Sequence, residues 1–148
     1  MSKKSIRTNT LHGSLIRLNK THRKMAKIEF QKVELTEGKP RLLDFINNNP
    51  GCSQREIATC CKIEPATATS ILSSMEKENL IYRERNPKDK RILNVFLTEK
   101  GIKAQKNVEK VFLELDEICF DGFSDEERLE AINTLNRLYE NLVKHKKE

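Results

Sequence analysis

Six stretches of the sequence carry apolar side chains at the three- and four-residue spacing of a helix that buries one face. They cover residues 11–30, 36–46, 53–60, 65–78, 98–119 and 124–148. Two shorter stretches, residues 80–85 and 92–97, are rich in Ile, Leu, Val, Tyr and Phe and predict strands. The polar, proline-containing residues 86–91 between them predict the turn of a hairpin.

Local signals mark where several of these helices begin. Residues 53–56 and 124–127 have the S-x-x-E pattern of a capping box, in which a Ser and a Glu satisfy free backbone N–H groups reciprocally. Pro65 falls where a first helical residue is expected, and a missing N–H costs least there. Thr36 is the expected N-cap of the second helix, with Glu37 in its first turn.

The order helix, helix, turn, helix, strand, strand predicts a winged helix-turn-helix, so the expected fold class is mostly α with a small β-hairpin wing. Ile57, Ala58, Ile63, Ala68 and Ile71 fall where such a unit needs small or apolar side chains. The outer side of the second helix of the motif is then expected to meet the major groove of DNA. Its residues are Ala66, Thr67, Thr69, Ser70, Ser73 and Ser74.

The predicted hairpin concentrates charge. Its charged residues are Arg83, Arg85, Lys88, Asp89, Lys90 and Arg91. Five cations on a short hairpin repel one another unless a polyanion lies alongside, so we interpret them as contacts to phosphates and to the minor groove. Taken alone, the cluster would be better interpreted as a solvated turn, and its place directly after a helix-turn-helix is what favours DNA contacts. A winged helix that docks onto protein is the other alternative, and a steep salt dependence of DNA binding separates the two.

Composition supports an anionic partner. The 148 residues carry a net charge of +6, and the excess is uneven, with nine basic and two acidic side chains in residues 1–35 but nine basic and twelve acidic in residues 99–148. Only 36% of the residues are hydrophobic, which suits a helix-rich chain that buries further surface against a copy of itself. We expect a cytoplasmic protein with no membrane segment and no secretory leader.

The cysteine pattern favours a structural role for these residues over a redox or metal-binding role. In the cytosol the four cysteines (Cys52, Cys60, Cys61 and Cys119) are expected to be reduced thiols, and no C-x-x-C or Cys/His spacing predicts a metal site. We interpret them as small buried hydrophobes. A thiol- or metal-responsive regulator using Cys52, Cys60 or Cys61 is the alternative. No phosphate loop, nucleophile–base set or apolar carboxylate pair is present, so neither an enzyme nor a cofactor is predicted.

From residue 35 to about residue 141 the chain resembles the MarR family of transcriptional regulators. The resemblance rests on the ordered pieces LTEGKPRLL (35–43), PGCSQREIA (50–58), EPATAT (64–69), NLIYR (79–83), NPKDKR (86–91) and LTEKG (97–101). It implies a homodimeric DNA-binding regulator of a pseudo-palindromic operator, and a ligand-responsive repressor in particular. It also implies a small aromatic effector. His22, Met25, Phe45 and Phe112 are candidate lining residues, and all four fit an ordinary core equally well.

The resemblance also assigns roles along the chain. Residues 1–34 and 99–148 would form helical dimerisation segments around a DNA-binding domain of residues 35–98. The dimerisation residues would include Leu11, Leu15, Leu18, Leu135, Tyr139 and Leu142. Arg91 would enter the minor groove with Asp89 orienting the wing. Thr67, Thr69 and Ser70 would approach base edges, with Ser53 and Gln54 near the DNA backbone.

One departure from the family pattern affects specificity. Many members carry Arg in the recognition helix, whereas this chain has Ser70 and Ser74, and its first basic residue there is Lys77. The bidentate Arg–guanine contact, which gives roughly 1–3 kcal/mol of base discrimination, is therefore unavailable. We expect an A·T-leaning site, contacted by threonine methyls on thymine and by wing arginines in a narrow groove.

Overall fold

A computed structural model describes residues 8–36 and 38–146. The elements are α1 (Leu11–Lys32), α2 (Lys39–Asn48), β1 (Cys52–Ser53), α3 (Gln54–Cys60), α4 (Pro65–Lys77), β2 (Ile81–Arg85), β3 (Leu93–Leu97), α5 (Glu99–Cys119) and α6 (Asp125–Lys146). The predicted fold class, mostly α with a small β-hairpin wing, is confirmed. The chain divides into two compact units, Met1–Leu115 and Asp116–Glu148. Within the described ranges, no helix combines the length and apolar character that crossing a membrane requires.

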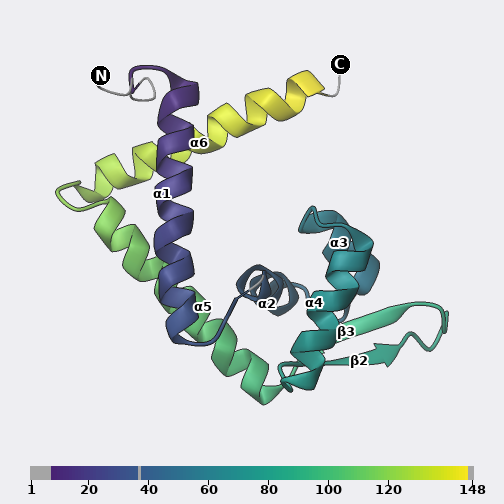
Figure 1. Ribbon diagram of the computed structural model, residues 1–148. Coiled ribbons are helices and arrows are strands. Elements are labelled where there is room, and N and C mark those ends of the chain that lie inside the picture. The colour runs from purple at the N-terminus through teal and green to yellow at the C-terminus, as the bar shows by residue number, and fades with distance from the viewer. Residues whose placement is uncertain (1–7, 37, 147–148) are drawn as a thin grey trace, which may run out of the picture. The chain divides into compact units, whose positions relative to one another are not determined.

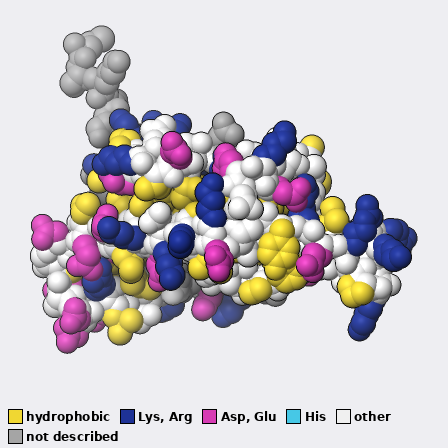
Figure 2. Space-filling view, turned by 90° about the horizontal axis from the view of Figure 1, so that it is seen from below, with side chains coloured by type: hydrophobic (Ala, Val, Ile, Leu, Met, Phe, Trp, Pro, Cys, Tyr) yellow, Lys and Arg dark blue, Asp and Glu magenta, His cyan; other side chains and the backbone are white. Residues whose placement is uncertain are grey.

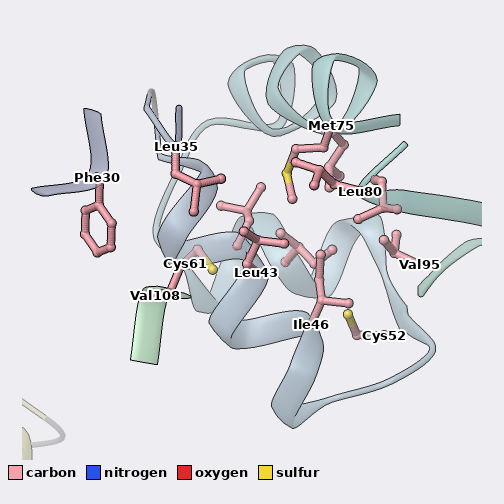
Figure 3. Packing of buried hydrophobic residues seen from close by; sticks show 14 of the residues in the cluster. Phe30, Leu35, Leu43, Ile46, Cys52, Cys61, Met75, Leu80, Val95 and Val108 are labelled. Carbon is pink, nitrogen blue, oxygen red and sulfur yellow. The ribbon is translucent and has the colours of Figure 1, made fainter. Parts of the chain in front are cut away.

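One hydrophobic core holds the first unit together. Leu43 and Ile46 of α2, Met75 of α4 and Val95 of β3 are almost completely buried and meet at its centre (Figure 3). The end of α1, through Ala26 and Phe30, and α5, through Val108, Val111 and Leu115, pack against the same core. The apolar periodicity indicated the buried sides of α2 and α4, whereas α1 is buried through Ala26 and Phe30 and its leucine stripe is exposed.

The helix-turn-helix has the close packing that its small residues predict. Ser53 accepts a hydrogen bond from the N–H of Glu56, and the Glu56 carboxylate accepts one from the N–H of Ser53, so the capping box is present. Ala58 and Ala68 are both buried, which lets α3 and α4 approach closely. Lys62 turns the chain between them at a φ of 53°.

The wing belongs to a three-stranded antiparallel sheet in the order β1-β3-β2. Strands β2 and β3 begin one residue later than predicted, and β1 was not predicted at all. This two-residue strand pairs Cys52 with Val95 and Ser53 with Asn94. Figure 1 shows the β2–β3 hairpin projecting from the first unit beside α4.

The predicted start of the second helix was wrong. Helix α2 begins at Lys39, with Gly38 as its N-cap at a φ of 81°, and Thr36 does not cap it. Glu37, placed in that first turn by the sequence, lies outside the described residues. Gly38 suits the cap because it adopts a left-handed conformation readily, and a Cβ there would lie 3.3 Å from Cδ1 of Ile71.

The second unit contains the end of α5, a turn and α6. The predicted break at residues 121–123 and the second capping box are confirmed, with Ser124 accepting from the N–H of Glu127. Arg128 forms an ion pair with Glu117 and lies over the ring of Phe120, which ties the start of α6 to the end of α5. Within this unit, α6 has no buried residue.

Candidate nucleic-acid interface

Helix α4 presents a hydroxyl-rich face. Its inner side is fixed by Ala68, Leu72 and Met75, which are fully buried. The predicted contact residues Ala66, Thr67, Thr69 and Ser70 are exposed on its first two turns, whereas Ser73 and Ser74 further along are half-buried. Of the predicted contact residues, those in the N-terminal half of α4 are therefore the ones open to a ligand.

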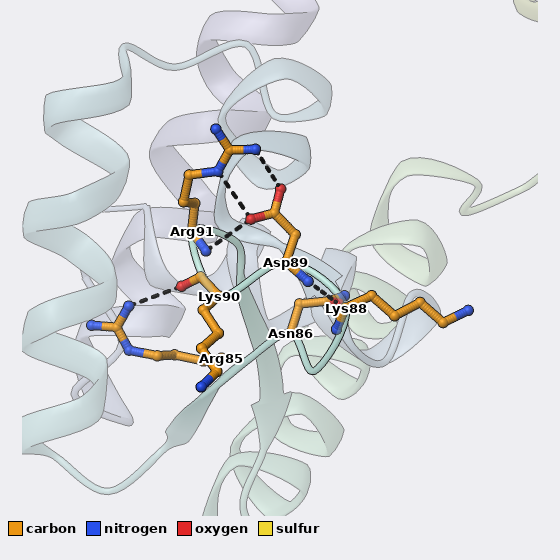
Figure 4. Close-up of polar contacts among 6 residues, drawn as sticks. All are labelled: Arg85, Asn86, Lys88, Asp89, Lys90 and Arg91. Carbon is orange, nitrogen blue, oxygen red and sulfur yellow. Dashed lines mark hydrogen bonds and ion pairs between the residues drawn. The ribbon is translucent and has the colours of Figure 1, made fainter.

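Side chain-to-backbone hydrogen bonds shape the tip of the wing. Oδ1 of Asn86 accepts from the N–H groups of Lys88 and Asp89, at 2.8 and 3.2 Å (Figure 4). Arg85 donates through Nη1 to the carbonyl of Lys90 at 2.9 Å. These bonds give the loop a defined conformation, so its cations are held together at the end of the hairpin.

Arg91 and Asp89 form a close pair at this tip. Nε of Arg91 donates to Oδ1 of Asp89 and Nη2 donates to Oδ2, both at 3.0 Å, and the N–H of Arg91 adds a third bond at 3.1 Å. The hydrogen bonds from Arg91 hold the pKa of Asp89 below its usual value, so its carboxylate stays charged. The Arg91 side chain nevertheless remains 89% exposed. Its direction is thus set before any ligand binds.

A groove of about 840 Å³ lies between the wing and the helix-turn-helix. Its lining includes Gln54 of α3, Thr69 of α4, and Asp89 and Arg91 of the wing. Figure 2 shows Lys and Arg side chains gathered at the projecting end of the wing. The arrangement combines a cationic edge with a wall of hydroxyl and amide groups, which are the groups that contact phosphates and base edges.

Arg83 does not share the open position of the other wing cations. Its side chain is 18% exposed and pairs with Glu76 of α4, with Nε 2.9 Å from Oε2. It also donates through Nη1 to Gln54 at 3.1 Å. The charge pattern of the sequence gave no sign of this role, because a paired and a free arginine look alike in it.

The comparisons with known proteins agree with this geometry. A MarR family model matches residues 35–92. The chain is also 30% identical over 112 residues to the HTH-type transcriptional regulator BilQ of Clostridium symbiosum, covering 76% of this chain and 78% of that protein. The chain belongs to the MarR family. It is thus a DNA-binding transcriptional regulator, and the family prediction made from the sequence is confirmed.

Solved structures show the same fold. A MarR transcriptional regulator from Methanosarcina mazei Go1 matches with a TM-score of 0.81 and 27% identity, over 90% of this chain and 96% of that one. A complex of S. aureus MepR with DNA matches with a TM-score of 0.74 over 90% and 96%. At 21% identity, the second likeness concerns the fold alone.

This MarR regulator has a second cavity, of about 730 Å³, between α1, α2 and α5. His22 and Phe112 line it, and their rings stack with centroids 6.4 Å apart. Cationic side chains, among them Arg23 and Arg41, also line it. Met25 and Phe45, the other two candidates from the sequence, are not among its lining residues.

The residues predicted to form a dimer interface are exposed in this single chain. On α1 these are Leu11, Leu15 and Leu18, and on α6 they are Leu135, Tyr139 and Leu142. In the described part of α6 every large apolar residue of the stripe lies at the surface. A helix with an apolar stripe of this kind normally buries it.

The four cysteines divide into two pairs. Cys52 and Cys61 are buried as predicted, but Cys60 and Cys119 are exposed, so that prediction was wrong for them. The exposed pair lies at helix ends: Cys60 is the last residue of α3, and Cys119 is the last residue of α5, four residues beyond Leu115, where α5 leaves the core. In residues 8–36 and 38–146, no three His, Cys, Asp or Glu side chains are grouped to hold a metal ion.

We expect a thiol reagent at neutral pH to modify Cys60 and Cys119 in the folded protein, and Cys52 and Cys61 only after unfolding. Burial, helped by the nearby Glu56, raises the pKa of Cys52 to about 11, and burial also raises the pKa of Cys61, so both stay protonated. Mass spectrometry after timed labelling measures this, with a Cys60→Ser, Cys119→Ser variant as the unreactive control. Rapid modification of Cys52 would contradict the prediction.

The raised pKa of Cys52 also makes the free energy of unfolding fall as the pH rises above 9. The folded protein holds this proton above pH 9, where the unfolded chain loses it. This contribution is therefore complete below pH 9 and is lost as the pH rises toward about 11.

Proposed function

We propose that this MarR regulator is a homodimeric repressor that occupies a pseudo-palindromic operator and is released by a small aromatic effector. The observation that carries the proposal is the groove lined by Thr69, from the exposed hydroxyl face of α4, and by Arg91, which is paired with Asp89. We assign the base contacts to Thr67, Thr69 and Ser70. Arg91 enters the adjacent minor groove, where an arginine is attracted by the enhanced negative potential of A·T tracts.

The remaining contacts are electrostatic. Arg85, Lys88 and Lys90 neutralise phosphates at the tip of the wing, and Ser53 approaches the backbone from the start of α3. Each phosphate neutralised releases counterions, so affinity falls steeply with salt. Such contacts position the protein without selecting a sequence.

A dimer follows from the uncovered apolar side chains. The stripe of α6 (Leu135, Tyr139 and Leu142) and the exposed leucines of α1 would be buried against a second copy, in keeping with the dimerisation segments 1–34 and 99–148. Two lobes then contact half-sites about one helical turn, roughly 34–36 Å, apart. A protein that stays monomeric in sedimentation at micromolar concentration contradicts this assembly.

The effector site that we propose is the cavity lined by His22 and Phe112. An aromatic ring can stack there, and Arg23 and Arg41 can pair with a polar substituent. The cavity is lined by residues of α1 and α5 and by residues of α2, so a ligand in it would contact both the dimerising helices and the DNA-binding domain. A ligand can change the spacing of the two DNA-binding domains of the dimer only by binding one conformation of the dimer more tightly than the other.

The proposal is tested by selecting duplexes from a random pool and titrating the winner at several salt concentrations. We expect an enriched pseudo-palindrome, two chains per duplex and a steep loss of affinity with salt. We also expect A·T pairs at the recognition-helix positions, because Thr67, Thr69 and Ser70 cannot make the arginine–guanine fork. G·C pairs there would contradict the base assignment, and no enriched motif would contradict sequence-specific binding altogether.

A further inference from the structure

A chain of hydrogen bonds links the wing to both helices of the helix-turn-helix. Glu76 of α4 accepts from Nε of Arg83 at 2.9 Å and from Nη2 at 3.4 Å. Nη1 of Arg83 donates to Oε1 of Gln54 at 3.1 Å, and Nε2 of Gln54 donates to Oγ1 of Thr69 at 2.8 Å. The Thr69 hydroxyl in turn donates to the carbonyl of Pro65 at 3.0 Å.

The chemistry of these groups fixes the direction of every bond in the chain. A guanidinium has only donors, so the side-chain oxygen of Gln54 must face Arg83 and its NH₂ group must face Thr69. The Thr69 hydroxyl then accepts from Gln54, and its own proton goes to Pro65. While both bonds of Thr69 are kept, it offers its second lone pair and its methyl group toward the groove, and Gln54 offers its other N–H.

Arg83 is placed to organise these groups and not to reach DNA itself. Its side chain is 18% exposed, against 89% for Arg91, and all three of its guanidinium nitrogens are engaged. Bidentate pairing with a carboxylate also fixes the plane of a guanidinium. The pKa of Glu76 is lowered by the hydrogen bond from Arg83, so the pair stays charged at neutral pH.

We propose that Arg83 is a positioning residue for DNA recognition, which holds Gln54 in one amide orientation and so makes Thr69 a hydrogen-bond acceptor at the groove. The inference rests on the proposed function of this groove. An acceptor beside a methyl group matches the edge of an A·T pair, where the adenine amino group donates and the thymine methyl offers an apolar contact. Without Arg83, the amide of Gln54 can turn over, and the polarity of Thr69 is no longer set.

The test compares Arg83→Met, Gln54→Ala and the double variant, using the selected operator and an unrelated duplex over a range of salt concentrations. We expect Arg83→Met to reduce the ratio of operator to unrelated affinity about tenfold while leaving the salt slope unchanged. The double variant should lose no more than the larger single loss, because both act through Thr69. A matched control is Lys88→Ala, at an exposed wing position, which should reduce the salt slope by about one per chain and leave the ratio unchanged.

Two outcomes overturn the proposal. A fall in the salt slope for Arg83→Met would mean that Arg83 contacts a phosphate, and additive losses in the double variant would mean that Arg83 and Gln54 act separately. Arg83→Lys guards against simple misfolding, because lysine keeps a charge beside Glu76 but cannot donate to Glu76 and Gln54 with a fixed fork. It should fold like the wild type, measured by circular dichroism, and still lose part of the discrimination.

A measurement on the DNA-free protein separates this inference from the function on which it rests. In the wild type, the side-chain NH₂ of Gln54 should show one restrained NMR environment that Thr69→Val perturbs and that Arg83→Met averages out. An averaged Gln54 signal in the wild type contradicts the network itself. If the wild type selects no operator but keeps the restrained signal, the proposed function has failed and the network has not.

Discussion

Replacing Arg91 with alanine is expected to weaken binding to the selected operator about a hundredfold. A specific arginine contact is worth about 1–3 kcal/mol, and a dimer carries two wings. Asp89 orients the guanidinium in the unbound protein through two 3.0 Å bonds. Fluorescence anisotropy titration at fixed salt measures the change.

Two further variants show what Arg91 supplies. Arg91→Lys keeps the charge but not the planar fork, so we expect it to recover the salt slope and only part of the affinity. Arg137→Ala removes an exposed arginine of α6, outside the groove, and should change operator affinity less than twofold. If Arg91→Ala lost no more than this control, the wing would serve a different partner.

Replacing Gly101 with alanine is expected to destabilise the protein by about 3 kcal/mol, the upper end of the usual cost of overpacking. A Cβ on Gly101 would lie 2.0 Å from the carbonyl oxygen of Leu80, which is backbone and cannot turn aside. The same oxygen accepts the N–H of Thr98 at 3.1 Å, so moving it breaks the junction between the wing and α5. Urea unfolding followed by circular dichroism measures the loss.

The sign of this effect makes it diagnostic. In an open helix, glycine to alanine stabilises by about 1 kcal/mol, so a loss here can come only from the close approach of α5 to Leu80. Lys103→Ala, at an exposed position of the same helix, should change stability by less than about 0.5 kcal/mol. A Gly101→Ala protein as stable as the wild type would show that α5 can move away at no cost.

The sequence predicted most of the fold because its signals are local. The capping box of Ser53 and Glu56 satisfies groups three residues apart, and the apolar periods of α2, α4 and α5 report the side that meets the core. The turn at residues 86–91 was also predictable, since it is built from its own side chains, with Asn86 bonding to Lys88 and Asp89.

The features that the sequence did not predict have a common cause, which is contact between residues far apart in the chain. Strand β1 has only two residues, too few for a period to be seen, and it exists because Cys52 and Ser53 pair with β3 more than forty residues away. The N-cap of α2 is Gly38 and not Thr36, at a glycine packed close to Ile71 of another helix. In the sequence, Gly101 was noted only as part of the LTEKG motif. The structure shows that a glycine is needed there because the carbonyl oxygen of Leu80 leaves no room for a Cβ.

The sequence by itself thus determined the family, the winged helix-turn-helix, and the concentration of cations on one hairpin. Only the tertiary structure decided which of these cations is open to a ligand. Arg91 remains exposed while paired with its near neighbour Asp89, whereas Arg83 is enclosed by Glu76 and by Gln54, 29 residues earlier in the chain. Charge and period are properties of the chain itself, but pairing depends on distances between groups that folding brings together, and these distances decide what each side chain can still bind.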